Sequence, residues 1–395
     1  MDYVVTNAEE NGKYYFESSS DFLNWFLEEK PIQKKFKFEN VDDIENLYLF
    51  LIYYDKIKSL VEEKVLEFND SLNDDNLFIK EALNELSISN SGGKYLRGVL
   101  VSLGYNSFGK EDNDYLSLSL ALEIFQTSIL IHDDIIDLSS KRRGTLTIPF
   151  RYKKRFADYD MGNIADSMAL CLGDLGFYEA NKILVNNYYD SPYLSLLLNY
   201  YNDVAIKTCK GEMIDVILPF YEKNGFDVPD LENNIIQIYK LKTAWYSVIG
   251  PFVLGSILAG ATSSEVKELE DALINLGVAY QIKDDLLGIF GNEEQIGKSS
   301  FSDSAEFKQT ILYSYAINTE YKTELLNYYG RCDLDTEGLK KIRKIFEDCG
   351  SKKYALDMME RLFRDSVKKI EMLDFSANYK KIVLGFCEFL KARGK

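Results

Sequence analysis

The stretch ILIHDDIIDLSSKRRG, residues 129–144, joins an apolar run to three aspartates and then to two arginines. On a helix, Asp133 and Asp137 lie one turn apart on the same face, and Asp134 lies beside them. Three carboxylates this close repel one another unless a cation binds among them, and Mg²⁺ binds carboxylates together with substrate phosphates. Guanidinium groups suit phosphate oxygens. The stretch therefore predicts a magnesium–diphosphate site. The alternative is a solvated charged helix end, which the preceding apolar run disfavours.

Composition narrows the class of protein. The chain has 395 residues, of which 46% are apolar and only six are proline, and this is typical of a protein with long helices and a large core. The net charge of -17 argues against a nucleic-acid partner. Five scattered cysteines without a C-x-x-C pair favour a reducing, cytoplasmic location over a disulfide framework. The single histidine, His132, excludes any site that needs two.

Apolar residues recur at helical spacing from about residue 41 onward, with breaks such as Asn90–Gly93 and Ser139–Pro149. The pattern predicts one all-α domain over residues 46–395. Residues 1–45 are expected to form an N-terminal extension that is either mobile or a short helix around Phe22, Trp25 and Phe26. Thr243–Ser264 carries no charge, but its length and composition favour a buried core helix, so no transmembrane segment is expected.

Further charged motifs accompany the first aspartates. Gly92-Gly93-Lys94-Tyr95-Leu96-Arg97 combines flexible backbone with two cations at a predicted helix start, where backbone N–H groups attract anions. Gln126 lies two turns before Asp133 on the same helix face. A second acidic stretch, YQIKDDLLG at 280–288, also follows an apolar helix. Two aspartate-rich helices together are more specific than either alone, because bundles commonly build metal sites from facing helices.

The ordered motifs resemble one family. GGKYLR, EIFQTSILIHDDIIDLSSKRRG, LGD, GEMID, LKTA, YQIKDDLLGIFG and GKSSFSDSAEFKQT, found between Gly92 and Thr310, are similar to motifs of the trans-isoprenyl diphosphate synthases, or polyprenyl synthetases. The resemblance implies an all-α isoprenoid synthase-type helical bundle around a deep central cavity, usually as a homodimer. It implies head-to-tail condensation of isopentenyl diphosphate with an allylic diphosphate, with Mg²⁺, three ions per site, as cofactor.

The resemblance also implies roles for individual residues. Asp133, Asp137 and Asp284 would bind the metal ions, supported by Asp134 and Asp285. The allylic diphosphate would be held by Arg142, Lys242 and Lys298, with Thr243, Gln281 and Lys308 as further substrate contacts. Isopentenyl diphosphate would be bound by Lys94, Arg97, Gln126 and Arg143. Gln126 stands where many members have histidine, and Gly288 where the third aspartate of the second motif often lies.

Product length in this family depends on side chains below the first acidic motif. Here these would be Ser128 and Ile129, then Phe125 one turn deeper. Because Ser128 is small, the growing chain is expected to pass it and stop at Phe125. We therefore expect geranylgeranyl diphosphate as product, with farnesyl or longer products as alternatives.

Three other functions are compatible with parts of the sequence. A class I terpene cyclase shares the bundle and the first motif but does not need an isopentenyl diphosphate site, so Lys94, Arg97 and the Lys242-Thr243 pair argue against it. A non-catalytic subunit of a heteromeric prenyl synthase is expected to lose aspartates, and both motifs are present here. A helical scaffold with surface acids would need all these spaced motifs to arise by chance.

Overall fold

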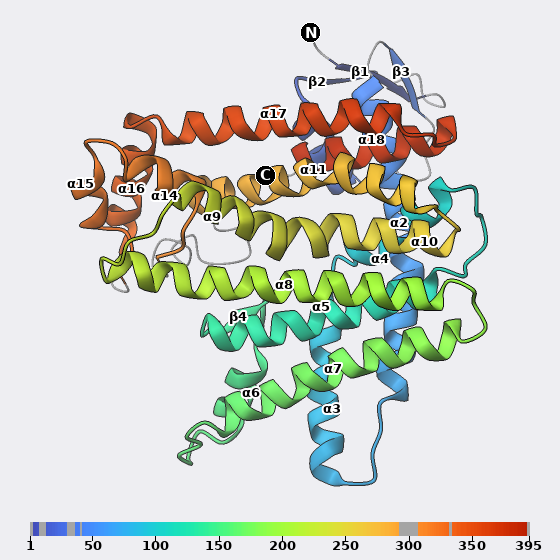
Figure 1. The fold of residues 1–395 in the computed structure, drawn as a ribbon, viewed down its shortest axis with the longest axis horizontal. Helices are drawn as coiled ribbons and strands as arrows, with labels where there is room; N and C mark the ends of the chain where they lie inside the picture. The colour runs from blue at the N-terminus through green and yellow to red at the C-terminus, as the bar shows by residue number, and fades with distance from the viewer. Residues whose placement is uncertain are drawn as a thin grey trace. The chain divides into compact units, whose positions relative to one another are not determined.

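Helices dominate the computed structural model, which describes residues 3–7, 13–29, 36–39, 42–291, 307–331 and 334–392 (Figure 1). In chain order its elements are β1 (Tyr3–Asn7), β2 (Lys13–Phe16), α1 (Ser19–Glu29), β3 (Phe36–Glu39), α2 (Asp42–Ser71), α3 (Leu77–Asn90), α4 (Leu96–Ser107), α5 (Leu116–Ile136), β4 (Lys141–Arg142), β5 (Thr145–Leu146), α6 (Ile148–Arg155), α7 (Ile164–Tyr188), α8 (Leu194–Lys223), α9 (Leu231–Ile238), the π-helix η1 (Tyr239–Ile249), α10 (Gly250–Leu258), α11 (Ser263–Phe290), α14 (Ile311–Ala316), α15 (Lys322–Leu326), α16 (Thr336–Asp348), α17 (Ser351–Met372) and α18 (Ala377–Ala392). The all-α prediction is confirmed.

The chain divides into two compact units. Unit 1 consists of Met1–Tyr53, Asp203–Gly250 and Ser263–Lys395. Unit 2 consists of Tyr54–Asn202 and Pro251–Thr262. The predicted site residues are divided between the units: unit 2 contains the first acidic motif and the GGKYLR stretch, and unit 1 contains the second acidic motif and Lys242.

In unit 2, helix α5 is the central element and packs along α7 and α4 (Figure 1). Two glycines of α7 make this close approach possible. A β-carbon on Gly173 would overlap with the His132 imidazole, and one on Gly176 would overlap with the Ser128 hydroxyl. Glycines also bring α4 against α10, because a β-carbon on Gly104 would overlap with the Phe252 carbonyl oxygen. Glycines thus let side chains of α5 lie against the backbone of α7, and let the backbones of α4 and α10 meet.

A short hairpin follows α5. Strands β4 and β5 pair antiparallel, with Arg142 opposite Thr145, and Arg143 and Gly144 form the two-residue turn. Both turn residues have positive φ, 51° and 78°, as a type I′ turn requires. The sequence predicts a break at this point but not a hairpin, since arginine is an uncommon residue in the left-handed region.

In unit 1, helix α11 packs against η1 and α17 (Figure 1). The contact with η1 is again close, because a β-carbon on Gly277 would overlap with Ala244. Helix α8 also lies close to η1, because a β-carbon on Gly211 of α8 would overlap with the backbone of Lys242 in η1. Gly173 and Gly211 thus both mark places where two helices approach closely. Segment η1 is a π-helix, a rare form that frequently occurs at functional sites.

The N-terminal segment is ordered where the structure describes it. Strands β2, β1 and β3 form an antiparallel sheet in that order, and α1 lies between β2 and β3 in the chain. The sequence analysis expects a short helix or a mobile segment and does not anticipate the sheet. Residues of β1, β2 and α1 share one apolar core with α2 and the end of α18: Val5, Phe16, Phe22, Leu23, Phe26, Ile44, Leu47, Leu51 and Ala392.

One described helical stretch, Leu231–Leu258, is long and apolar enough to cross a membrane, and 78% of it is buried inside the protein. Such burial is typical of a core helix. The expectation of a buried core helix in this region is therefore confirmed. The uncharged segment Thr243–Ser264 is not one continuous helix, since it comprises most of η1, all of α10, the loop that follows and the first two residues of α11.

Candidate active site

The first acidic motif lies at the C-terminal end of α5. Asp137 caps the helix, and its N–H donates to the Asp133 carbonyl oxygen at 2.8 Å, so the i and i+4 positions are held one turn apart. Asp133 and Asp137 are half-buried, whereas Asp134 is buried. The chain then leaves the helix through Leu138, whose φ is 51°. This turn directs the following residues back toward the aspartates.

The hairpin brings the side chain of Arg142 back to the first acidic motif. Its Nη2 lies 2.9 Å from Asp133 Oδ2, and its Nε lies 2.6 Å from Asp134 Oδ1. These charge-assisted bonds neutralise part of the acidic cluster. The structure thus brings together the acids and the first arginine, which the sequence analysis groups in one site.

His132 has a packing role. Its Nε2 lies 3.2 Å from the Leu170 carbonyl oxygen and 3.5 Å from Asp174 Oδ1, and its ring meets Phe177 edge to face. All three partners belong to α7, so the side chain binds α5 to α7.

The GGKYLR stretch forms the loop between α3 and α4. Gly92 has a φ of 71°, and Tyr95 has a φ of 50° with its ring buried. The Tyr54 hydroxyl donates to the Lys94 carbonyl oxygen at 2.5 Å. Arg97 lies in the first turn of α4. The loop backbone is therefore held in a strained but defined shape at the position of Lys94 and just before Arg97.

Arg143 joins this loop. Its Nη1 lies 3.4 Å from the Ser89 carbonyl oxygen and 3.3 Å from that of Ser91. A β-carbon on Gly93 would stand only 3.3 Å from the same nitrogen. The structure thus places Arg143 beside the loop that carries Lys94 and Arg97.

A buried acidic side chain that the sequence analysis does not single out contacts the backbone of α4 next to Arg97. Glu123 of α5 is 4% exposed, and its Oε1 accepts the Gly98 N–H at 2.8 Å. Burial raises the pKa of Glu123, while the Gly98 hydrogen bond and the charges of Arg97 and Arg143 oppose that rise. An acid inside the apolar run of α5 is the sequence signal that could have identified it.

The remaining isopentenyl-site candidate, Gln126, is half-buried on α5, one turn beyond Glu123 toward the acidic motif. In unit 2 the structure therefore groups Lys94, Arg97 and Arg143 at one loop. It does not test the role of Gln126.

In unit 1, Lys242 is paired with two acids of α8. Its Nζ lies 2.8 Å from Glu212 Oε2 and 2.6 Å from Asp215 Oδ2. The GEMID stretch, residues 211–215, thus supplies the counter-charges of Lys242, a predicted diphosphate-binding residue. The lysine reaches them because Gly211 lets α8 approach the backbone of η1.

Asp285 is the buried end of a chain of hydrogen bonds. Thr243 Oγ1 donates to Gln281 Oε1 at 2.6 Å, and Gln281 Nε2 donates to Asp285 Oδ1 at 2.9 Å. The Tyr239 hydroxyl donates to Asp285 Oδ2 and accepts the Ile311 N–H at 3.0 Å. Burial and the Asp285 charge raise the pKa of Tyr239 well above its usual range. These hydrogen bonds link Asp285 and Gln281 of α11 to Tyr239 and Thr243 of η1. Tyr239 is a supporting residue that the sequence analysis missed.

The other candidates of the second motif are placed less completely. Asp284 is half-buried on α11, one residue before the buried Asp285. The backbone carbonyl oxygen of Lys308 accepts a hydrogen bond from the Tyr329 hydroxyl at 2.8 Å. Lys298 lies outside the described residues.

The product-length candidates have different surroundings. Ser128 is fully buried, its hydroxyl donates to the Ile124 carbonyl oxygen at 3.0 Å, and the side chain lies against Gly176 of α7. It is therefore part of the contact between α5 and α7. Phe125 lies in an aromatic layer, with ring centroids 5.1 Å from Tyr201 and 5.5 Å from Phe177. Ile129 is half-buried.

The donor set suits a hard divalent ion that is shared with a substrate. Within the described residues, no three histidine, cysteine or acidic side chains converge closely enough to hold a metal by themselves. Mg²⁺ characteristically uses one or two carboxylates and completes its shell with phosphates and water. Asp133 and Asp137, one turn apart at the end of α5, fit that mode of binding.

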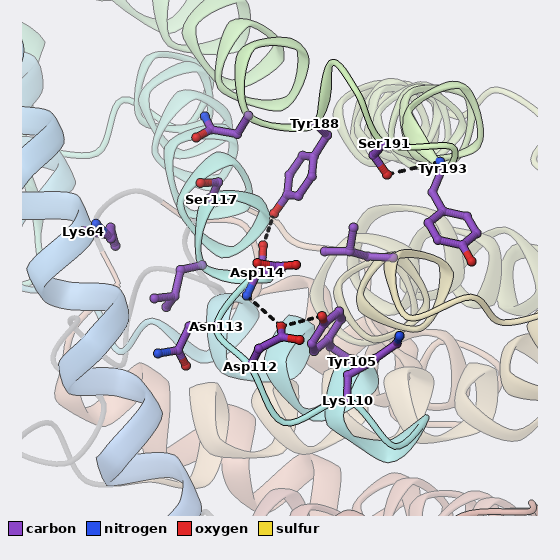
Figure 2. Close-up of a pocket in the computed structure, with 13 residues that line it drawn as sticks. Lys64, Tyr105, Lys110, Asp112, Asn113, Asp114, Ser117, Tyr188, Ser191 and Tyr193 are labelled. Carbon is purple, nitrogen blue, oxygen red and sulfur yellow. Dashed lines mark hydrogen bonds between the residues drawn. The ribbon is translucent and has the colours of Figure 1, made fainter.

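Figure 2 shows a pocket of about 530 Å³ elsewhere in unit 2. It is lined by the start of α5, by the loop before it and by the end of α7, including Tyr105, Asp112, Asp114, Ser117 and Tyr188. Its polar groups largely satisfy one another, since Tyr105 donates to Asp112 at 2.6 Å and Tyr188 to the Asp114 carbonyl oxygen at 2.5 Å. The pocket adjoins the opposite end of α5 from the aspartates and is not part of the candidate site.

The fold and the acidic helix ends define an all-α enzyme that uses divalent metal ions to transfer prenyl groups. The model of the family described as "Polyprenyl synthetase" matches residues 79–348, and the chain belongs to this family. It is a prenyltransferase of the short-chain type. The family prediction and the activity class are thus confirmed.

Individual relatives agree with this assignment. A farnesyl pyrophosphate synthase from Candida albicans is 30% identical, over 84% of this chain and 94% of the relative. A geranylgeranyl diphosphate synthase from Sulfolobus acidocaldarius is 25% identical, over 78% of this chain and 91% of the relative. A crystal structure of geranylgeranyl pyrophosphate synthase from Corynebacterium glutamicum, complexed with isoprenyl diphosphate and magnesium, has the same fold. Its TM-score is 0.76 at 22% identity, over 85% of this chain and 98% of that one.

Proposed function

We propose that this enzyme condenses isopentenyl diphosphate with an allylic diphosphate, head to tail, in a reaction that depends on Mg²⁺. One observation carries the proposal. The turn between β4 and β5 directs Arg142 to Asp133 and Asp134, and directs the next residue, Arg143, to the loop with Lys94 and Arg97. Adjacent arginines thus serve two separate anion sites, as a reaction between two diphosphate substrates requires.

On the allylic side, Asp133, Asp137 and Asp284 would hold the metal ions, three per site, with Asp134 and Asp285 in support. When bound, the ions neutralise the negative charge of the leaving diphosphate. Arg142 is positioned to share that charge because its guanidinium already lies against the carboxylates of Asp133 and Asp134. Lys242, with Thr243, Gln281, Lys298 and Lys308, would hold the same substrate. The Glu212 and Asp215 contacts fix the orientation of the Lys242 ammonium group.

On the other side, Lys94, Arg97, Gln126 and Arg143 would bind the diphosphate of isopentenyl diphosphate. Loss of the allylic diphosphate leaves a carbocation, which the alkene of isopentenyl diphosphate attacks, and a proton is then released. The departing diphosphate is the base we assign, because His132, the one histidine, is engaged with Leu170 and Asp174. Apolar side chains on α5 would exclude water from the cation.

We propose geranylgeranyl diphosphate as the product. Ser128 is committed to the contact with α7, so Ile129 and Phe125 remain as candidates for the floor. A floor at Phe125 is one helical turn, about 5.4 Å, deeper than one at Ile129, which favours the longer product over farnesyl diphosphate.

We further propose a cytoplasmic homodimer. Ile206, Met213, Ile217 and Phe220 of α8 are exposed and recur at helical spacing, which gives an apolar stripe that a second copy would cover. Cys171, Cys209, Cys349 and Cys387, the cysteines in the described part of the chain, are free thiols, as in a reducing compartment. Light scattering of the purified chain tests the dimer, and an Ile217→Glu, Phe220→Glu variant is expected to be monomeric.

The deciding experiment uses the purified chain with Mg²⁺ and labelled isopentenyl diphosphate. Dimethylallyl, geranyl and farnesyl diphosphates are supplied separately, and the dephosphorylated products are separated by chromatography. A ladder that ends at the twenty-carbon alcohol supports the proposal. A cyclic hydrocarbon released from an allylic substrate alone would make the protein a cyclase. Failure to turn over any pair would indicate a required partner subunit.

A further inference from the structure

Helix α6, which begins two residues after the β4–β5 hairpin, carries an arginine that has no part in the reaction proposed above. The side chain of Arg151 is only 15% exposed and makes four hydrogen bonds. Its Nε donates to Glu85 Oε2, and its Nη1 donates to the Leu146 carbonyl oxygen at 2.6 Å. Its Nη2 lies 2.9 Å from both the Glu85 carbonyl oxygen and the Ser89 hydroxyl oxygen. A planar guanidinium group can bind several partners in fixed directions at once, as it does here.

The anchor of Arg151 is Glu85, an acidic side chain of α3 that is 2% exposed. Glu85 Oε2 accepts the bond from Arg151, and Oε1 accepts one from Nη2 of Arg155, so both carboxylate oxygens are paired. Burying a carboxylate is unfavourable unless hydrogen bonds and opposite charges compensate, and two guanidinium groups supply both here. The pairing therefore holds α6 against α3.

The same arginine joins the two segments that Arg143 connects. Leu146 belongs to β5, the second strand of the hairpin. Ser89 lies in the last turn of α3, before the GGKYLR loop, and its carbonyl oxygen accepts Arg143 Nη1 at 3.4 Å. Arg151 thus binds the hairpin through Leu146 and the end of α3 through the Ser89 hydroxyl. These contacts fix the distance that the Arg143 side chain has to span.

The two arginines of the hairpin are held differently. Arg142 makes two ion pairs, with Asp133 and Asp134, at 2.9 and 2.6 Å. Arg143 bonds two neutral backbone carbonyl oxygens at 3.4 and 3.3 Å. Long hydrogen bonds are weaker than short ones, and an ion pair adds the attraction of opposite charges. A loosened hairpin would therefore displace Arg143 before it displaces Arg142.

We propose that Arg151, anchored on Glu85, is a positioning residue that holds the hairpin so that Arg143 stays at the isopentenyl diphosphate site. This inference rests on the proposed function of that site. Arg151 acts through the backbone of Leu146 and the end of α3, and not by binding the substrate. A cation that is fixed in place before the substrate arrives lowers the cost of binding. Loss of these contacts should therefore weaken the binding of isopentenyl diphosphate selectively.

The test keeps the charge opposite Glu85 and removes the planar guanidinium group. Arg151→Lys retains a cation, but an ammonium group cannot bind Leu146 and Ser89 in the same directions. We expect the KM of isopentenyl diphosphate to rise about tenfold, because a displaced binding group loses much of its effect. The kcat and the KM of the allylic diphosphate should change less than about twofold, since Arg142 keeps its own partners.

A milder variant decides the question if the lysine variant does not fold. Ser89→Ala removes one hydrogen bond of Arg151 and leaves the ion pair with Glu85 intact. It should raise the KM of isopentenyl diphosphate about threefold, as expected for one lost hydrogen bond. A wild-type KM in Ser89→Ala would count against the inference.

Arg155→Lys is the matched control. Arg155 pairs with the same carboxylate, Glu85, and its other ion pair is with Glu81 at 3.8 Å. Both acids belong to α3, so the substitution alters the ion pair and leaves the contact with the hairpin in place. It should leave all three constants within about twofold of the wild type. A rise in the KM of isopentenyl diphosphate equal to that of Arg151→Lys would indicate a general structural role and overturn the inference.

A double-mutant cycle tests whether Arg151 acts through Arg143. Arg151→Lys should weaken isopentenyl diphosphate binding in the wild-type background and have little further effect once Arg143→Gln has been introduced. Additive effects, or an Arg151→Lys variant with the wild-type KM for isopentenyl diphosphate, would contradict the proposal. If the wild-type enzyme itself does not bind isopentenyl diphosphate, the proposed function fails instead.

Discussion

The Ser128 hydroxyl occupies the space that a β-carbon on Gly176 would need. One turn further along, His132 stands in the same relation to Gly173. Helices α5 and α7 are therefore in contact along a line of paired small and large residues that leads directly to the aspartates. The position of the acidic motif depends on this contact, since α5 ends only four residues after His132.

Gly176→Ala should destabilise the protein by about 1–3 kcal/mol, because the added methyl group forces the two helices apart. Urea unfolding followed by circular dichroism measures the loss. Ser128→Ala makes room for the new methyl group, so the double variant should recover most of the stability. If Gly176→Ala unfolds at the wild-type urea concentration, the close contact of α5 and α7 is wrong.

Phe125→Ala should lengthen the product. The substitution removes one ring of the layer formed with Tyr201 and Phe177, and the growing chain would then extend past that layer. Chromatography of the products from farnesyl and isopentenyl diphosphates measures the change. Tyr201→Phe, which keeps the ring and removes only a buried hydroxyl, is the control and should give the wild-type product. An unchanged product from Phe125→Ala would move the floor to Ile129.

Removing divalent metal with a chelator should abolish activity without unfolding the protein. Arg142 already pairs with Asp133 and Asp134, so the acidic cluster retains a counter-charge when no metal is bound. Activity should return on addition of Mg²⁺, and the melting temperature should change little throughout. Asp133→Asn should lower kcat on the order of 100-fold, as expected when one source of transition-state charge stabilisation is lost. Asp174→Asn, an exposed acid on α7, should be close to wild type.

Some elements of the fold could be predicted from the sequence and others could not. Helical spacing identified the helices and most breaks, because apolar period and glycine–proline signals are local properties. The i, i+4 aspartates were found for the same reason. The hairpin at Arg143 was not predicted, because its turn lacks the usual Asn-Gly signal. The turn is instead stabilised by tertiary contacts of Arg142 and Arg143.

Residues whose contacts are tertiary were the ones that sequence analysis missed. Tyr239 and Glu123 contact Asp285 and Gly98, which lie next to them in space but far away in the sequence. The contact of Ser128 could not be predicted for a related reason. Its distance from Asp133 along the helix is known from the sequence, but the neighbour it faces, Gly176, is not.

Lys242→Gln should impair binding of the allylic diphosphate. The variant loses a cation of the proposed site and leaves Glu212 and Asp215 without their shared partner. The KM for farnesyl diphosphate should rise about tenfold or more, and stability should also fall, because breaking a partly buried ion pair leaves uncompensated charge. Lys240→Gln, on the first turn of the same π-helix, is the matched control. A Lys242→Gln enzyme with the wild-type KM would remove Lys242 from the substrate site.

Stability should decrease with rising pH through the ionisation of Glu388. Burial raises the pKa of this carboxyl, as do the charges of Asp43 and Glu360, while Lys391 and the Ser19 hydroxyl oppose the rise. The folded state therefore binds a proton more tightly than the unfolded chain. The associated stability is fully present below the ordinary glutamate pKa of 4.5 and is lost as pH rises through the folded value. Glu388→Gln should reduce this loss, as thermal unfolding across that pH range would show. An unaltered pH dependence in the variant would contradict the assignment.

The shared core of α1, α2 and α18 has a consequence for how the chain folds during synthesis. Val5 and Phe22 pack in one cluster with Ala392, and the Ser20 hydroxyl donates to the Ala392 carbonyl oxygen at 3.1 Å. Unit 1 therefore cannot complete this core until residues near 392 have left the ribosome, whereas all of unit 2 is available once residue 262 has emerged. Contacts of such long sequence separation are slow to form. Until α18 has been synthesised, the apolar face of α1 remains exposed. We therefore expect the N-terminal segment to be the part of the nascent chain that most needs protection from aggregation.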